Sequence, residues 1–362
     1  MPHLDRREFL KSLPALAAAP FDFAHGRPRL LAQSPGAPLI PVRALNHMTL
    51  SVSDPKRSLD FYQGLFGMPV QARQGQTTLL RIGSGPQFLA LSGAGASGKP
   101  SINHYCLTVD NFDADRALAA LAKVGVTRAE GAGGGLSGGP LKARVRMRGP
   151  ESGGAPRGTP ELYFGDPDGI VVQLQDTTYC GGSGVLGSTC GAPEPAPKKG
   201  LLAVRDLSHF TISATDAARS NKFYQDLFGL EVQARQGPTA PLLGVGAGVQ
   251  FLMFTGGAGA GRAGAPAAPP RPASINHVCM NMDSFKPDDI LKTLESYGIK
   301  PRGNIQGPAG PMVSYVSMRM ENRGGAKEGT PELYFTDPDG LLIQLQDVKY
   351  CGGAGYLGDI CP

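Results

Sequence analysis

The chain has 362 residues, of which 41% are hydrophobic and 18% charged, which is typical of a folded globular protein and excludes a disordered one. Its length suggests two or three domains, and no apolar run approaches the roughly 18 residues that a membrane-spanning helix requires. The formal net charge of +5 comes without a stripe of basic residues, which excludes the electrostatic pattern of a nucleic-acid-binding protein.

The N-terminal segment, residues 1–33, is predicted to be an export leader. Arg6 and Arg7 precede a short apolar stretch, LPALAAAP, and small residues follow near a cleavage point that lies between Ala19 and Gln33. This pattern resembles a twin-arginine signal, which exports proteins that have already folded. The resemblance implies a periplasmic or secreted protein. The alternative is an amphipathic N-terminus that stays on the chain.

The first predicted strand lies in LNHMTLSV, around His47. Polar and apolar side chains alternate along it, so that they point to opposite faces. The polar face consists of His47, Thr49 and Ser51, and the apolar face consists of Met48, Leu50 and Val52. We expect the apolar face to pack under a helix and the polar face to line a cleft.

A helix is predicted directly after this strand. Asp54 is a favourable N-cap residue, Pro55 fits the first helical position, and the helix is expected to end before Gly67. The later stretch PQFLALSG has the composition of a further strand.

The same pattern begins again at INHYCLTV, a predicted strand with His104 near its start. A helix is expected over about 113–124, ending at Gly125. The hairpin GTPELYFGDPDGIVVQLQD, residues 158–176, closes the module and carries Gln173 on its last strand. Each module therefore has the order β-α-β-β-β.

A proline-rich linker, GAPEPAPKKG at residues 191–200, separates two similar halves. LNHMTLSVSDPKRSLDFYQGLFGMPVQARQG before the linker matches LSHFTISATDAARSNKFYQDLFGLEVQARQG after it, and the hairpin recurs as GTPELYFTDPDGLLIQLQD. The halves, residues 40–190 and 201–362, are interpreted as duplicated domains. The predicted fold class is α+β, with four βαβββ modules.

The six cysteines divide into two matched pairs and two single residues. The pairs enclose glycine-rich loops at equal spacing and are Cys180–Cys190 and Cys351–Cys361. In an exported protein they predict two local disulfides, although four cysteines allow three connectivities. Cys106 and Cys279 each follow a histidine by two residues and are interpreted as buried packing residues with free thiols.

Four of the six histidines recur at the same position in the four modules, near the start of the opening strand. They are His47, His104, His209 and His277, while His3 and His25 lie in the leader. A single such histidine is more often an ordinary strand residue than a ligand. Recurrence in every module favours a functional role, although duplication copies residues and the four are not independent observations.

Paired βαβββ modules, a histidine on each opening strand and the motif YF-x-DPDG resemble the vicinal oxygen chelate superfamily. That superfamily includes glyoxalase I, extradiol ring-cleaving dioxygenases, and fosfomycin-resistance and bleomycin-binding proteins. The resemblance covers nearly all of the chain after the leader. It implies two tandem glyoxalase-like domains, each with a β-lined cleft.

The resemblance also implies a metal site in each half. In metal-dependent members, two opening-strand histidines and an acid four residues after the glycine of DPDG are the ligands. The corresponding residues are His47, His104 and Gln173 in the first half, and His209, His277 and Gln344 in the second. Both acids are glutamines here. An uncharged carbonyl oxygen weakens divalent binding and favours Fe(II) over Fe(III), with Mn, Zn or Ni as alternatives. Loss of the metal site is the competing interpretation.

Further candidates lie on the hairpins. Tyr163 and Tyr334 match the place where ring-cleaving dioxygenases hold a tyrosine against the substrate oxygen. Glu161 and Glu332 share the tyrosine face and are candidate bases, or else exposed carboxylates. Two matched arginines are expected to be solvated, with binding of an anionic substrate as the alternative; they are Arg148 and Arg319.

The sequence therefore predicts an exported metal-dependent enzyme whose small substrate binds through adjacent oxygens. An oxygenase acting on a catechol-like compound is the leading form. A glyoxalase-like isomerase or lyase, which needs a base, is the next alternative. A non-catalytic protein that sequesters a small ligand is the alternative of a different class. The substrate, the metal and the oligomeric state are left open.

Overall fold

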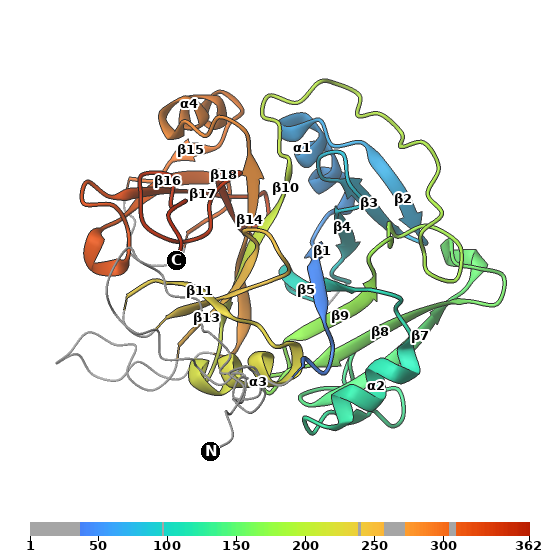
Figure 1. Ribbon diagram of the computed structural model, residues 1–362. Coiled ribbons are helices and arrows are strands. Elements are labelled where there is room, and N and C mark those ends of the chain that lie inside the picture. The colour runs from blue at the N-terminus through green and yellow to red at the C-terminus, as the bar shows by residue number, and fades with distance from the viewer. Residues whose placement is uncertain (1–36, 96–97, 238–239, 257–271, 304–308) are drawn as a thin grey trace, which may run out of the picture. The chain divides into compact units, whose positions relative to one another are not determined.

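The computed structural model describes residues 37–95, 98–237, 240–256, 272–303 and 309–362 (Figure 1). The predicted leader lies outside these residues. In the part of the chain that is described, no helix combines the length and the apolar character needed to cross a membrane.

Each half forms one mixed sheet, and the secondary structure follows the predicted modules. The elements of the first half are β1 (Val42–Val52), α1 (Pro55–Phe66), β2 (Val70–Gln74), β3 (Thr77–Arg81), β4 (Phe88–Gly93), β5 (Ser101–Val109), α2 (Ala114–Ala122), β6 (Thr127–Arg128), β7 (Lys142–Arg148), η1 (Pro150–Ser152), β8 (Thr159–Gly165) and β9 (Val171–Asp176). The elements of the second half are β10 (Asp206–Ser213), α3 (Ala217–Phe228), β11 (Val232–Arg235), β12 (Pro241–Gly244), β13 (Phe251–Thr255), β14 (Ser274–Met282), α4 (Pro287–Ser296), β15 (Lys300–Pro301), β16 (Val313–Arg319), η2 (Glu321–Arg323), β17 (Thr330–Thr336) and β18 (Leu342–Asp347).

The strand order places the opening strands at the centre of each sheet. The first sheet runs β2-β3-β4-β1-β5-β9-β8-β7-β6, and the second runs β11-β12-β13-β10-β14-β18-β17-β16-β15. β1 pairs antiparallel with β5, and β5 pairs parallel with β9. The two histidine strands and the glutamine strand of each half are therefore neighbours. The predicted α+β class with four βαβββ modules is confirmed, and two-residue strands, β6 and β15, are additions to it.

The first helix begins and ends where the sequence predicts. The Asp54 side chain accepts hydrogen bonds from two backbone N–H groups of the first turn, which satisfies donors that a helix start leaves free. Gly67 ends the helix with a left-handed φ of 65°, a conformation that glycine adopts without steric cost. The second helix spans Ala114–Ala122. It is shorter than predicted, since it ends three residues before Gly125.

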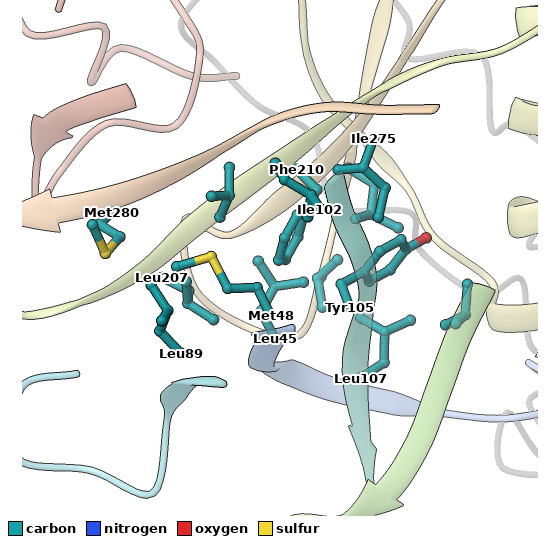
Figure 2. Close-up of a cluster of buried hydrophobic side chains, with 14 of the residues drawn as sticks. Leu45, Met48, Leu89, Ile102, Tyr105, Leu107, Leu207, Phe210, Ile275 and Met280 are labelled. Atoms are coloured by element: carbon teal, nitrogen blue, oxygen red, sulfur yellow. The ribbon is translucent and has the colours of Figure 1, made fainter. Parts of the chain in front are cut away.

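The first helix of each half contacts a strand of the other half. The ring of Phe61 on α1 lies 6.4 Å from that of Phe335 on β17, and Phe223 on α3 lies 6.4 Å from Phe164 on β8. The apolar faces of the opening strands complete a shared core, which Figure 2 shows with Met48 and Tyr105 beside Phe210. Burying apolar surface from both halves in one core couples their stability.

The DPDG motifs join the halves as well. Asp339 accepts hydrogen bonds from the backbone N–H of Ser53 at 2.9 Å and from its hydroxyl at 2.5 Å, and it forms an ion pair with Arg57. Asp168 makes the matching contacts with Thr215 and Arg219. Each hairpin turn therefore holds the start of the first helix of the opposite half.

The expectation of solvated arginines is wrong. Arg148 and Arg319 are buried, with exposed fractions of 7% and 0%. Each donates from Nε to a buried glutamate, Glu161 at 2.6 Å and Glu332 at 2.7 Å. A buried guanidinium requires such a partner because an unpaired charge away from water is strongly unfavourable.

Both predicted local disulfides are confirmed. Cys180 is bonded to Cys190, and Cys351 is bonded to Cys361. Cys106 and Cys279 are free and buried, as expected. The buried arginines attach to these loops, since Arg148 Nη2 donates to the carbonyl of Gly182 at 2.9 Å and Arg319 Nη2 donates to that of Gly353 at 3.0 Å.

Candidate functional site

Two histidines and a glutamine meet on the open face of the first sheet. His47 lies on β1, His104 on β5 and Gln173 on β9, and these strands are adjacent. All three side chains are buried. Gln173 Oε1 lies 3.0 Å from His47 Nε2 and 3.2 Å from His104 Nε2. Strand pairing thus brings together residues that lie as far as 126 positions apart in the sequence.

Asparagines determine which imidazole nitrogen carries the proton. Asn46 Nδ2 donates to the backbone carbonyl of Tyr179 at 2.9 Å, so that its Oδ1 faces His47 Nδ1 at 2.7 Å. Asn103 Oδ1 lies 2.8 Å from His104 Nδ1. Because an amide oxygen only accepts hydrogen bonds, each Nδ1 is protonated and each Nε2 carries a lone pair. This is the tautomer that a metal-binding Nε2 requires. At His104 the Nε2 lone pair has the Thr49 hydroxyl as a neighbour at 3.2 Å.

Burial keeps these histidines neutral. Desolvation lowers the pKa of His104 to about 4, and the charge of Arg146 lowers it further. Gln173 Oε1 opposes both effects because it would accept a hydrogen bond from the protonated ring. Desolvation also brings the pKa of His47 well below its ordinary value, with a contribution from His104. Near neutral pH both imidazoles are therefore uncharged and able to coordinate a cation.

The first-half group fits a metal ion. Its three converging atoms are all hydrogen-bond acceptors, while Gln173 Nε2 is buried without a partner. Three lone pairs at this separation repel one another unless a cation lies among them or the amide turns to present its NH₂ group. Two imidazoles and an amide oxygen suit a divalent transition metal, and bonds of about 2.1 Å place neighbouring ligand atoms about 3 Å apart. No group of three or more His, Cys, Asp or Glu in the described residues could hold a metal ion, so the glutamine is essential to this fit.

The second half repeats the arrangement with small differences. His209 Nε2 lies 3.1 Å from Gln344 Oε1, and Asn276 Oδ1 lies 2.8 Å from His277 Nδ1. Ser208 takes the place of Asn46, with its hydroxyl 3.2 Å from His209 Nδ1. Burial lowers the pKa of His277 to about 4 and that of His209 well below its ordinary value. His277 Nε2 and Gln344 Nε2 are buried without hydrogen-bond partners.

Both groups line cavities. The first cavity has a volume of about 490 Å³ and is lined by His47, His104, Gln173 and Tyr163 among others, which lies within the range of about 300–1,000 Å³ typical of small-molecule sites. The second has a volume of about 190 Å³ and is lined by the matching His209, His277, Gln344 and Tyr334. The first cleft therefore has room for a small ligand, whereas the volume of the second is smaller.

Glu161 is the centre of a buried network beside the first cleft, so it is not an exposed carboxylate. Its Oε1 accepts from Arg148 at 2.6 Å and from the Tyr179 hydroxyl at 2.9 Å. Its Oε2 accepts from the Tyr163 hydroxyl at 3.2 Å. In the second half, Glu332 has the same partners, which are Arg319, Tyr350 and Tyr334.

Sequence reasoning missed two pairs of aromatic residues. Tyr179 and Tyr350 immediately precede the first cysteine of each disulfide, and that matched position was the available signal. Phe88 stacks on His47 with a centroid distance of 4.3 Å, and Phe251 stacks on His209 at 4.2 Å. The sequence placed both phenylalanines on strands, but it did not indicate their contact with histidine.

The family follows from a match that covers most of the chain. A sequence model of the Glyoxalase/Bleomycin resistance protein/Dioxygenase superfamily matches residues 44–174 and 206–345. The chain belongs to this superfamily. The twofold match also confirms the prediction of two tandem glyoxalase-like domains. No curated protein matches the sequence.

Solved structures of a glyoxalase and of dioxygenases share the fold of this chain at low sequence identity. The Mn(II)-bound glyoxalase from Novosphingobium aromaticivorans is 16% identical, with a TM-score of 0.54 over 84% of this chain and 82% of that one. The 2,3-dioxygenase LapB from Pseudomonas sp. KL28 is 14% identical, with a TM-score of 0.55 over 90% and 95%. Homoprotocatechuate 2,3-dioxygenase from Brevibacterium fuscum, in complex with 3,4-dihydroxyphenylacetate, is 18% identical, with a TM-score of 0.53 over 87% and 83%. These similarities establish the fold. They do not identify the reaction, which is inferred from the residues of the site.

Proposed function

We propose that this protein is an exported, metal-dependent enzyme that acts on a small substrate with adjacent oxygens, and that it is an oxygenase acting on a catechol-like compound. The observation that carries the proposal is the convergence of His47 Nε2, His104 Nε2 and Gln173 Oε1 at 3.0–3.2 Å beside a cavity. A Mn(II)-bound glyoxalase and a catechol 2,3-dioxygenase that share the fold support this range of chemistry.

The ligand set explains the substrate class. His47, His104 and Gln173 would hold a divalent ion in the first cleft, and His209, His277 and Gln344 would hold one in the second. When bound, such an ion acts as a Lewis acid that lowers the pKa of a coordinated hydroxyl. All three protein ligands are uncharged, so the double positive charge is left for the substrate to neutralise. This favours a chelating anion, and it favours Fe(II), with Mn(II), Zn(II) and Ni(II) as alternatives.

Tyr163 and Glu161 offer a path for a substrate proton. The Tyr163 hydroxyl belongs to a cavity-lining residue and donates to Glu161 Oε2 at 3.2 Å. A substrate hydroxyl that donates to the Tyr163 oxygen would pass its proton to that oxygen while the tyrosine proton moves to Glu161. Burial raises the pKa of Tyr163 well above its ordinary value, so the tyrosine transmits a proton and does not serve as the base itself. Tyr334 and Glu332 form the matching pair.

The contacts of Glu161 give less support to an isomerase or lyase. Such a reaction needs a base that reaches a carbon-bound proton directly. Glu161 Oε1 accepts from Arg148 and Tyr179, and Oε2 accepts from Tyr163, so the carboxylate is held in place by three donors. Glu161 lines the cavity beside Tyr163, and its hydrogen bond to the Tyr163 hydroxyl suits removal of a proton from a substrate oxygen.

We also propose export. The two disulfides indicate folding or residence in an oxidising compartment. Arg6 and Arg7 in the leader suggest the twin-arginine route. That route transports folded proteins, so a metal loaded before export would remain with the protein.

Metal analysis combined with an oxygen-uptake screen tests the function. The chain is purified without oxygen, its metal content is measured, and catechols are added with recording of oxygen consumption and of ring-cleavage absorbance. We expect one to two metal ions per chain and oxygen uptake with at least one catechol. A metal-free protein that binds catechols without consuming oxygen would instead be a sequestering protein.

A further inference from the structure

The two metal-binding groups differ in how their first histidine is held. In the first half, Asn46 lies between two partners: its Oδ1 accepts from His47 Nδ1 at 2.7 Å, and its Nδ2 donates to the Tyr179 carbonyl at 2.9 Å. Asn46 is 1% exposed. Anchored at both ends, the asparagine holds the imidazole in one orientation and one tautomer.

The Tyr179 carbonyl belongs to a rigid part of the chain. Tyr179 immediately precedes Cys180, which is bonded to Cys190. Its ring is buried, and its hydroxyl donates to Glu161 at 2.9 Å and accepts from Gln74 Nε2 at 3.0 Å. The anchor of His47 is therefore continuous with the disulfide loop.

The second half lacks this connection. Ser208 replaces Asn46, and its hydroxyl lies 3.2 Å from His209 Nδ1. The other partner of the Ser208 hydroxyl is the thiol of Cys279, and a hydroxyl rotates about a single bond, so it holds the imidazole less firmly than a doubly anchored amide. In the described part of the chain, no side chain donates to the carbonyl of Tyr350, the counterpart of Tyr179. Ring stacking is the same in both halves, at 4.3 and 4.2 Å, so packing does not account for a difference between the sites.

The second group is equally compact, with imidazole centroids 5.5 Å apart against 5.6 Å in the first, but its glutamine contacts differ. In the first half, Gln173 Oε1 contacts both histidines, at 3.0 and 3.2 Å. In the second half, Gln344 Oε1 lies 3.1 Å from His209 Nε2, and His277 Nε2 has no hydrogen-bond partner.

We propose that Asn46 is a positioning residue that makes the first site hold a divalent metal more tightly than the second, through its link to Tyr179 and the Cys180–Cys190 loop. This inference rests on the proposed metal-dependent function. The reason is preorganisation, since an imidazole already fixed in its ligand geometry loses less freedom when it binds the ion. Residues that orient a ligand from behind typically change metal affinity by about 10–100-fold.

The test measures Mn(II) binding at each site separately, from the loss of the spin-resonance signal of free Mn(II). The full chain carrying His209→Ala and His277→Ala reports the first site, and the chain carrying His47→Ala and His104→Ala reports the second. We expect the first site to bind Mn(II) about tenfold more tightly. Mn(II) binding in neither chain would refute the metal-dependent function itself, whereas equal binding in both would refute only the difference between the sites.

Exchanging the two residues identifies the cause. In the chain that reports the first site, Asn46→Ser should weaken Mn(II) binding to about the level of the second site. In the chain that reports the second site, Ser208→Asn should strengthen it. Asn103→Ser is the matched comparison, because Asn103 orients His104 and its Nδ2 donates to Ser51 Oγ and not to the disulfide loop. Asn46→Ser with unchanged Mn(II) affinity would overturn the proposal.

The disulfide provides a second, independent readout. Replacing Cys180 and Cys190 with serine should weaken Mn(II) binding at the first site, while replacing Cys351 and Cys361 should change binding at the second site less. Thermal unfolding of both variants is measured to check that they remain folded at the assay temperature. A loss of equal size at both sites would show that the loops act on metal binding without Asn46, which contradicts the proposed link.

Discussion

The hydroxyl of Tyr62 donates a hydrogen bond to Asp337 Oδ2 at 3.1 Å, between residues that lie 275 positions apart. Tyr224 repeats the contact in the opposite direction, with its hydroxyl 3.3 Å from Asp166 Oδ2. Both tyrosines and both aspartates are buried. The first aspartate of each DPDG motif is therefore part of the interface between the halves.

Tyr62→Phe is expected to destabilise the protein by about 1–3 kcal/mol, because Asp337 then lacks one hydrogen-bond donor in a buried place. Tyr224→Phe should cost at least as much, since it removes the donor to Asp166 and also the acceptor of the buried Tyr105 hydroxyl. Chemical unfolding monitored by circular dichroism measures both. Tyr356→Phe is the control, since Tyr356 is 56% exposed, and a loss as large as that of Tyr62→Phe would contradict the role of the buried contact.

The metal-free protein is expected to lose stability as the pH falls from about 6.5 to 4. Burial lowers the pKa of His104 and His277 to about 4, whereas the unfolded chain takes up these protons near the ordinary pKa of about 6.5. Protons bound only by the unfolded state favour unfolding. Urea unfolding at a series of pH values checks this in a variant with Asp166→Asn and Asp337→Asn, because these buried aspartates oppose the effect. A stability of that variant that stays constant across the window would contradict the buried neutral histidines.

The buried aspartates change the stability with pH in the direction opposite to the histidines. Burial raises the pKa of Asp166 and Asp337 to about 6, so the folded state binds protons between about 6 and 4 that the unfolded state does not, and stability rises as the pH falls through this range. Asp166→Asn with Asp337→Asn removes this contribution. We expect the double variant to lose stability more steeply on acidification than the unaltered protein, and a shallower loss would disprove the sign of the effect.

Gln173→Glu is expected to increase the divalent metal affinity of the first site. The substitution keeps the position of the side-chain oxygen and adds a negative charge next to the cation. Competition with a chelator measures the affinity. Thr77→Glu adds the same charge at another residue that lines the cavity, so an equal gain from both variants would mean that Gln173 is not a ligand. Activity need not rise, because the added charge competes with an anionic substrate.

Tyr163→Phe is expected to lower kcat by about 10²–10⁴-fold while metal content is retained, because it interrupts the proton path to Glu161. The pH profile of kcat should change with it, which a purely structural effect would not cause. Tyr334→Phe tests the second cleft in the same way. Unchanged kcat in both variants would remove these tyrosines from the mechanism.

Arg6→Lys with Arg7→Lys is expected to retain the protein in the cytoplasm, because twin-arginine export depends on the arginine pair. Cell fractionation and immunodetection measure the distribution. Continued export of the double variant would exclude this route.

The local structure and the duplication could be predicted from the sequence. Alternation around His47 showed which face of β1 is buried, and Asp54 and Gly67 indicated both ends of α1. These features depend on neighbouring residues, for which periodicity and capping are sufficient physical causes. The disulfide pairs were predictable for the same reason, since the cysteines of each pair are only ten positions apart in a glycine-rich stretch.

The sequence by itself therefore determined the modules, the fold class and the residues that share each open face. Only the tertiary structure decided that Arg148 is buried with Glu161, that Tyr62 reaches Asp337, and that Asn46 connects His47 to the disulfide loop while Ser208 does not. Those contacts join segments far apart in the chain, and they depend on strand register and on how the two halves pack, which no local pattern specifies. The exchange of Asn46 for Ser208 can be read from the sequence, but its effect on the two sites depends on what each residue contacts across the fold.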